Sequence, residues 1–175
     1  DVLAALQKLA AHHRSRFKLD VIGITGSNGK TIVKEWLYQL MAADRTIVRN
    51  PKSYNSQIGV PLSVWQISEK DDLGIFEAGI STVNEMGKLE AIIRPTIGVL
   101  THIGPAHDEG FKDRREKVLE KLKLFKHCKL LVYNYDRLLD YEDDIPGTNR
   151  FTWSREFNQT DLYVFGETVI SRNYY

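Results

Sequence analysis

Short apolar runs alternate with longer amphipathic stretches along most of the chain. The runs that predict strands fall at residues 21–24, 46–49, 73–78, 96–103 and 130–133. Between them, apolar residues recur every three or four positions, which is the spacing of one helical face. Helices are therefore predicted at residues 32–43, 60–67, 81–94 and 113–128. This alternation predicts an α/β fold with a mostly parallel sheet and helices on both faces.

The start of the chain departs from this alternation. Leucines recur there at every third position, on one face of a predicted helix. We interpret residues 1–18 as a leading or linker helix and residues 19–175 as one domain. The basic residues at 12–14 are expected to interact as cations with the C-terminal end of the helix dipole.

Local signals mark the ends of two helices and the last strands. Thr82 and Glu85 have the spacing of a capping box, and Asp113 with Glu116 opens the next helix. Residues 151–153 and 162–170 predict strands with no helix between them. The sequence therefore predicts a small antiparallel edge or subdomain near the C-terminus.

Composition narrows the class of protein. The 175 residues carry a formal net charge of +1, which gives no support to a nucleic-acid partner. Cys128 is the only cysteine, so no internal disulfide can form. The apolar runs are too short for a membrane span, and the first residues do not resemble a signal peptide. We expect a cytoplasmic protein.

A glycine-rich turn between the first predicted strand and the next helix predicts a phosphate-binding loop. It reads Gly23-Ile-Thr-Gly-Ser-Asn-Gly-Lys-Thr31. Inward-pointing backbone N–H groups and a helix N-terminus attract phosphate. Lys30 would reach the β- and γ-phosphates, and Thr31 would place its hydroxyl on Mg²⁺. The general expression requires glycine where Ile24 stands, so a glycine-rich turn with a surface lysine is the alternative.

Two polar residues follow predicted strands and are expected at the same edge of the sheet. Glu77 ends one buried run, and His107 lies in the loop after the next strand. Ligands bind at the carboxyl ends of parallel strands, and a carboxylate suits Mg²⁺. The alternatives are an acid that faces water and a solvated loop histidine.

Lys121 projects into the apolar arc of the predicted helix 113–128, whereas Lys117 lies only at its margin. A lysine there can lay its stem on the core and extend its ammonium to water. Burial would instead lower its pKa and favour the neutral, nucleophilic amine.

Several motifs in order resemble the Mur ligases, which add amino acids to a cell-wall precursor. The phosphate loop at 25–31 has their form, and Lys121 to Phe125 fits their Lys-x-x-Ile-Phe pattern with one leucine for isoleucine. The segments at 55–61 and 107–111 are similar to those of the members that use D-alanyl-D-alanine. Asn134 and Asp136 are similar to an Asn-x-Asp turn of the family, although turn formation explains them equally well.

The resemblance implies a site for ATP and two Mg²⁺ ions. The residues implied in nucleotide binding are Thr25, Gly26, Ser27, Asn28, Gly29, Lys30, Thr31, Asn55, Asn134 and Asp136. The implied metal ligands are Thr31, Glu77, His107 and Lys121, the last as a carbamate formed with CO₂. Lys30, His107 and Lys121 are the implied catalytic residues.

The resemblance also implies the reaction. The full enzyme would join UDP-N-acetylmuramoyl-tripeptide to D-alanyl-D-alanine through an acyl phosphate. Counterparts of the family's N- and C-terminal domains are absent from the sequence, so the chain alone is expected not to ligate. Residues 10–17 resemble forms fused to an alanine racemase. The alternatives are another Mur-type ligase such as a folylpolyglutamate synthase, an unrelated phosphate-loop kinase or GTPase, and a nucleotide-binding fragment without turnover.

Overall fold

A computed structural model describes residues 1–104, 108–166 and 168–171, and eight strands in these ranges form one sheet. The strands are β1 (Asp20–Thr25), β2 (Ile47–Arg49), β3 (Leu73–Glu77), β4 (Ile97–Leu100), β5 (Leu130–Asn134), β6 (Asn149–Ser154), β7 (Leu162–Phe165) and β8 (Thr168–Ser171). Their order across the sheet is β2-β3-β1-β4-β5-β6-β7-β8. All neighbours are parallel except β7 and β8. The predicted fold class is confirmed.

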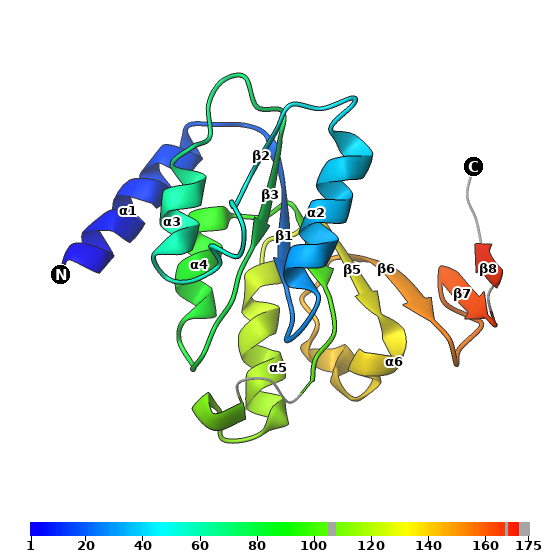
Figure 1. Cartoon of the computed structure of the whole chain (residues 1–175). Helices are drawn as coiled ribbons and strands as arrows, with labels where there is room; N and C mark the ends of the chain where they lie inside the picture. The colour runs from blue at the N-terminus through cyan, green and yellow to red at the C-terminus, as the bar shows by residue number, and fades with distance from the viewer. Residues whose placement is uncertain (105–107, 167, 172–175) are drawn as a thin grey trace.

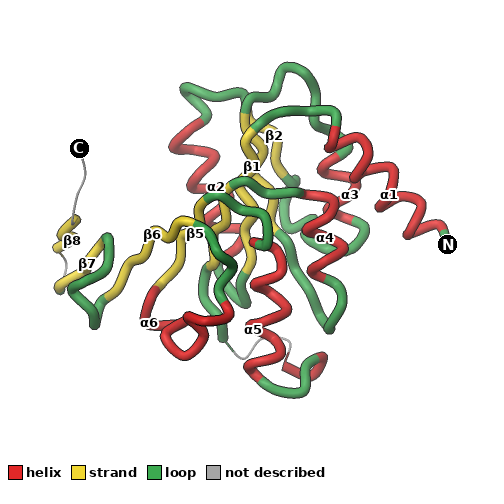
Figure 2. The backbone as a smooth tube through the Cα atoms, turned by 180° about the vertical axis from the view of Figure 1, so that it is seen from behind, coloured by secondary structure: helices red, strands yellow, loops and turns green. Residues whose placement is uncertain are grey.

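Helices occupy most of the connections between strands. They are α1 (Val2–Ser15), α2 (Lys30–Met41), α3 (Gly59–Val64), α4 (Met86–Ile93), α5 (Arg114–Leu122) and α6 (Tyr135–Leu138), with 3₁₀ turns at Asp108–Gly110, Lys123–Phe125 and Leu139–Asp144. Both ribbon views place α1, α3 and α4 near one end of the sheet and β7 and β8 at the other (Figures 1 and 2). Among the described residues, no helix is long and apolar enough to cross a membrane.

Alternating side chains of the central strands give the sheet two apolar faces. Ile22 and Ile24 of β1 pack on one face with β3 residues and with the apolar side of α2. Val21 of β1 and Phe76 of β3 belong to a larger core on the other face, which includes side chains of α1, α3, α4 and α5. Successive residues of a strand point to opposite faces, so both faces of these strands are buried. The phosphate loop follows directly from this rigid centre.

Helix α1 is packed on α3 and α4. Arg14 is buried, and its guanidinium donates to the carbonyl oxygens of Ile93 (2.9 Å) and Phe17 (2.8 Å). Arg14 thus lies in the last turn of α1, as predicted, but its guanidinium also binds a carbonyl of α4 and so joins the two helices. Burial, followed by repulsion from Arg94, lowers its pKa.

Helix α4 begins later than the capping signal predicts. The Glu85 carboxylate accepts hydrogen bonds from the N–H groups of Ser81 and Thr82, and the bond from Thr82 is one half of the predicted capping box. However, Asn84 has a φ of 63°, which interrupts helical geometry, and the helix starts only at Met86. The contacts of the capping box thus stabilise a turn in front of the helix.

The C-terminal strands extend the sheet. The single run predicted at 162–170 is two strands, β7 and β8, with a turn at Gly166 (φ 59°) between them. They form the predicted small antiparallel edge, whereas β6 pairs in parallel with both β5 and β7. Sequence alone does not distinguish these cases, because a parallel edge strand and an antiparallel one share the same period of two.

Candidate functional site

The loop between β1 and α2 curls so that the helix N-terminus is open toward solvent. Gly26 has a φ of 149° and Gly29 a φ of 83°, conformations that favour glycine. A Cβ on Gly26 would lie 2.0 Å from the hydroxyl of Thr101. Gly29 is the N-cap of α2, and no side chain of the described residues makes a capping hydrogen bond at this helix end. The first N–H groups of the helix therefore remain available to an anion.

The segment after β4 fixes the outer side of the loop. The Ser27 N–H donates to the carbonyl of His102 at 2.7 Å, and the Ser27 hydroxyl donates to the carbonyl of Gly104 at 3.0 Å. Thr101 donates to the carbonyl of Asn28 at 2.7 Å. Thr25 is fully buried with its hydroxyl on the carbonyl of Ala78, so this side chain shapes the strand end and does not face the loop mouth.

Lys30 folds back over the loop that precedes it. Its ammonium donates to the carbonyls of Gly26 (2.8 Å) and Ser27 (3.1 Å). Burial lowers its pKa, and the charge of Glu77 opposes that effect. The sequence prediction placed this cation at the loop, and the structure places it there.

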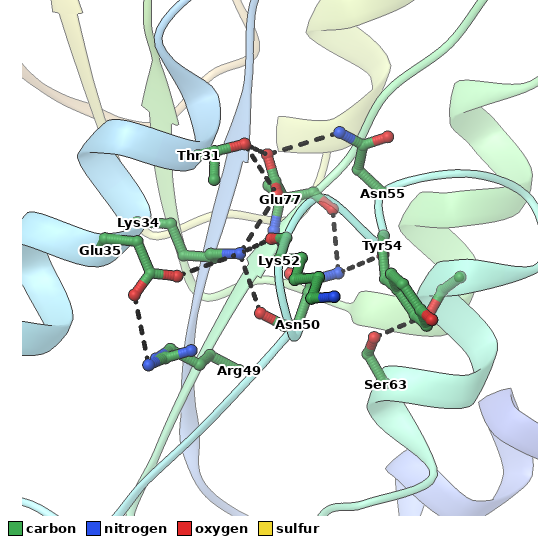
Figure 3. Close-up of polar contacts among 11 residues, drawn as sticks. Thr31, Lys34, Glu35, Arg49, Asn50, Lys52, Tyr54, Asn55, Ser63 and Glu77 are labelled. Atoms are coloured by element: carbon green, nitrogen blue, oxygen red, sulfur yellow. Dashed lines mark hydrogen bonds and ion pairs between the residues drawn. The ribbon is translucent and has the colours of Figure 1, made fainter.

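Glu77 meets Thr31 as the topology predicts. Its carboxylate is fully buried and accepts from the Thr31 hydroxyl, at 3.1 Å on Oε1 and 2.9 Å on Oε2 (Figure 3). The side-chain amide of Asn55 lies 3.5 Å from Oε2. Three residues distant in sequence are thus brought together beside the phosphate loop.

This oxygen set fits Mg²⁺. No group of three or more histidine, cysteine, aspartate or glutamate side chains is placed to hold a metal within the described part of the chain. Mg²⁺ is commonly bound by one or two protein oxygens, with water and substrate phosphates completing its octahedron. Glu77 and Thr31 would hold the ion, and the phosphates would supply further oxygens.

Two buried residues that the sequence analysis missed complete the surroundings of Glu77. Lys34 is fully buried and its ammonium lies 3.2 Å from Glu77 Oε1. Asn50, also fully buried, accepts the Glu77 N–H on its side-chain oxygen at 2.7 Å. The only sequence signal for Lys34 is its position one helical turn after Lys30, on the side of α2 that faces β3.

Three lysines converge behind the loop. Lys121 is buried, and its ammonium lies 3.3 Å from the Gly26 carbonyl that Lys30 also contacts. Lys117 is buried as well, with its ammonium on the carbonyl of Gly104, although its helical angle places it only at the margin of the apolar arc. Burial, then repulsion from Lys30 and Lys117, lowers the pKa of Lys121 to about 8. The predicted position of Lys121 inside the apolar arc agrees with its burial.

His107 lies outside the described residues. The adjoining 3₁₀ turn, Asp108–Gly110, is described, and a Cβ on Gly110 would clash with the carbonyl of Ser81. Glu109 in this turn is exposed to solvent.

Asn134 and Asp136 line a hollow on the side of the loop away from Glu77. Its walls also include Asn28, Gly29 and Trp153. The Asn134 amide donates to Asp136 and to the carbonyl of Trp153. These two residues therefore line a cavity that opens onto the phosphate loop. A role in turn formation alone would not require that position.

The site agrees with comparisons to known proteins. Residues 24–166 match the model of the Mur ligase middle domain. The UDP-N-acetylmuramoyl-tripeptide–D-alanyl-D-alanine ligase of Borreliella burgdorferi is 36% identical over 135 residues, which are 77% of this chain and 29% of that protein. The enzyme of the same name from Rickettsia prowazekii is 32% identical over 94% of this chain and 38% of its own length.

A solved structure shows the same fold. The Thermotoga maritima enzyme of this type, in complex with ADP, superposes with a TM-score of 0.81 at 27% identity, covering 98% of this chain and 42% of that chain. The chain thus spans about a third of the length of the curated relatives that it matches. With a phosphate loop, a buried glutamate and a buried lysine in the positions described, the chain belongs to the Mur ligase family and carries its middle domain.

Proposed function

We propose that this chain is the ATP-binding part of an enzyme that joins D-alanyl-D-alanine to UDP-N-acetylmuramoyl-tripeptide in the synthesis of peptidoglycan precursors. The observation that carries the proposal is the meeting of Thr31 and Glu77 at the mouth of the phosphate loop. The names of the curated relatives support the choice of substrates. Because the reaction consumes ATP, we place it in the cytoplasm.

The residues of the loop would bind the triphosphate. The open N-terminus of α2 and the Lys30 ammonium supply positive potential for the β- and γ-phosphates. For this, Lys30 exchanges its loop carbonyls for phosphate oxygens. Thr31 and Glu77 would hold Mg²⁺, which neutralises phosphate charge when it is bound.

The hollow at Asn134 and Asp136 would take the nucleoside end of ATP. It joins the phosphate loop at Asn28 and Gly29, and Trp153 and Val33 give it apolar walls. Such a mixture of apolar surface and a few polar groups is typical of small-molecule sites. The ADP complex of the Thermotoga maritima relative supports a nucleotide at this domain.

The reaction brings two anions together. A carboxylate oxygen of the tripeptide attacks the γ-phosphorus, and the bond between this phosphorus and the oxygen that bridges it to the β-phosphate breaks. The products are ADP and an acyl phosphate. The amine of D-alanyl-D-alanine then attacks the acyl carbon, phosphate leaves, and the nitrogen loses a proton. Lys30 and Lys117 bring positive charge to this region, which lowers the repulsion between carboxylate and phosphate.

We further propose that Lys121 is carbamylated in the working enzyme. Its neutral amine attacks the carbon of CO₂, a C–N bond forms, and one proton is released. A pKa of about 8 leaves an appreciable share of the amine neutral near physiological pH. The carbamate oxygens, together with His107, would hold a second Mg²⁺.

The test uses the full-length protein that contains this chain. We expect phosphate release from ATP to require both the tripeptide nucleotide and D-alanyl-D-alanine, and hydroxylamine to trap the acyl phosphate. Preference for a single amino acid over the dipeptide would instead indicate another Mur-type ligase. Nucleotide hydrolysis without a trappable acyl group would indicate a phosphate-loop hydrolase and contradict the proposal.

A further inference from the structure

Lys34 lies in the most densely connected polar cluster beside the site. Its ammonium donates to the carbonyl of Asn50 at 2.8 Å and to the carbonyl of Lys52, and it pairs with Glu77 Oε1 at 3.2 Å (Figure 3). Glu35 Oε1 lies 3.4 Å away on the solvent side. An ammonium has three N–H donors, and in a fully buried site all three require acceptors. The backbone carbonyls and Glu77 supply them.

The same cluster holds the loop that follows β2. Asn50 donates to the carbonyls of Tyr54 (2.7 Å) and Glu77 (3.3 Å), while its own side-chain oxygen accepts the Glu77 N–H. Beyond the cluster, the Gly79 N–H donates to the carbonyl of Asn55 at 2.8 Å. Residues 50–55 are thereby fastened across the end of β3, with Lys34 and Asn50 as the two anchors.

This arrangement fixes which side of the Glu77 carboxylate faces the phosphate loop. Lys34 contacts Oε1, whereas Oε2 makes the shorter bond to Thr31 and lies nearest to Asn55. A Cβ on Gly79 would lie 2.8 Å from the side-chain oxygen of Asn55, so close packing confines that amide as well. The Glu77 carboxylate and the Asn55 amide are thus held in place by buried contacts on the protein side of the site.

We propose that Lys34 is a positioning residue that aims Glu77 and fastens the 50–55 loop, and that the metal-dependent part of nucleotide binding depends on it. Lys34 touches neither phosphate nor metal in this proposal. It acts through Glu77 and Asn55, and the inference therefore rests on the proposed nucleotide site.

Charge and position make opposite predictions for the loss of Lys34. A fixed cation next to Glu77 repels Mg²⁺, so charge alone predicts tighter metal binding in its absence. Positioning predicts weaker binding, because Mg²⁺ demands near-ideal octahedral geometry and an unanchored carboxylate and loop supply it poorly. Because the Lys34 ammonium makes several buried contacts, we expect the loss of positioning to outweigh the loss of charge repulsion.

The test compares Lys34→Met with Lys70→Met, the same substitution at an exposed lysine outside the cluster. A non-hydrolysable ATP analogue is titrated calorimetrically with Mg²⁺ and again with EDTA. In the wild-type chain the ratio of the two affinities measures the gain from the metal. We expect this gain to fall by roughly tenfold in Lys34→Met, while the affinity in EDTA stays within about twofold. Lys70→Met should behave as the wild type.

A gain that is unchanged or larger in Lys34→Met would overturn the inference. An equal loss in Mg²⁺ and in EDTA would also overturn it, since it would show a general structural defect. If Lys34→Met does not fold, Lys34→Arg decides. Its planar guanidinium keeps the charge but cannot match the acceptors of an ammonium, so the metal gain should fall by roughly threefold, and a wild-type gain would contradict us.

A measurement without nucleotide separates this inference from the proposed function. In Lys34→Met, amide hydrogen exchange should speed up at Glu77 and Gly79, whose N–H groups are bound to the 50–55 loop, and stay slow in β1. If the wild-type chain binds no nucleotide, the proposed function fails and this exchange pattern still tests the anchor. Unchanged exchange at both residues would show that Lys34 fastens nothing.

Discussion

Replacing Lys121 by methionine should stabilise the free chain at neutral pH. Methionine has a similar length and packs well in apolar surroundings. Lys121 is buried beside two further lysines, and among the described residues its ammonium contacts the Gly26 carbonyl oxygen at 3.3 Å. The substitution removes a charge that folding takes out of water, at the cost of that one contact.

The pKa of Lys121 sets the size and the sign of the change in the free energy of unfolding. A fall from 10.5 to about 8 means that the unfolded chain holds the proton more tightly, by roughly 3 kcal/mol. The penalty on the folded state is complete below pH 8 and disappears as pH rises from 8 to 10.5, because the unfolded chain binds more protons in that window. After allowing for the lost hydrogen bond, we expect Lys121→Met to gain about 2 kcal/mol at pH 7.

The assay is urea unfolding of both chains at pH 7 and pH 10 in buffers freed of CO₂, so that no carbamate forms. The difference between their free energies of unfolding should shrink toward zero at the higher pH. Lys126→Met, at an exposed position of the same segment, serves as the control and should change the free energy by less than about 0.5 kcal/mol. A Lys121→Met chain that is less stable at pH 7, or a difference that does not vary with pH, would refute the reasoning.

Two further substitutions test the packing. Arg14→Ala should lower the free energy of unfolding by about 2 kcal/mol because it leaves buried carbonyls without donors, while Arg16→Ala at an exposed position should change it little. A small effect of both in urea unfolding would show that α1 is not part of the domain. Gly98→Ala should cost about 2 kcal/mol, since its Cβ would lie 2.4 Å from the Phe125 ring, whereas Gly87→Ala, with open space in a helix, should gain up to about 1 kcal/mol. Thermal unfolding that ranks these two glycine variants in the other order would contradict the packing described.

The parts of the site that sequence predicts are those that follow from topology and periodicity. Thr31 and Glu77 meet because the carboxyl ends of adjacent parallel strands share one edge, and β1 and β3 are neighbours. Lys121 is buried because its helical angle points into the apolar arc, which local spacing reveals. Both inferences need only the period and the order of the elements.

The residues that sequence analysis missed depend on contacts between distant segments. Lys34 has the appearance of an ordinary helix lysine, and its burial arises from residues 50–54, which fold over it from another connection. Asn50 is likewise explained only by the backbone of Glu77, 27 residues further along. Helical periodicity also does not predict the burial of Lys117. Its angle places it at the margin of the apolar arc, and the segment around Gly104, which is distant in sequence, contacts it there.

The most direct test of a phosphate site at this loop is calorimetric titration of the chain with Mg-ATP, comparing the wild type with Lys30→Ala and with Lys70→Ala as a charge-matched control at an exposed position. Lys30 is the cation that sits on the loop, and a charge-assisted contact of this kind is worth roughly 1.5–3 kcal/mol, or about 10- to 100-fold in affinity. We predict that loss for Lys30→Ala and wild-type affinity for Lys70→Ala. Equal binding by the wild type and Lys30→Ala would contradict the assignment of the loop to phosphate.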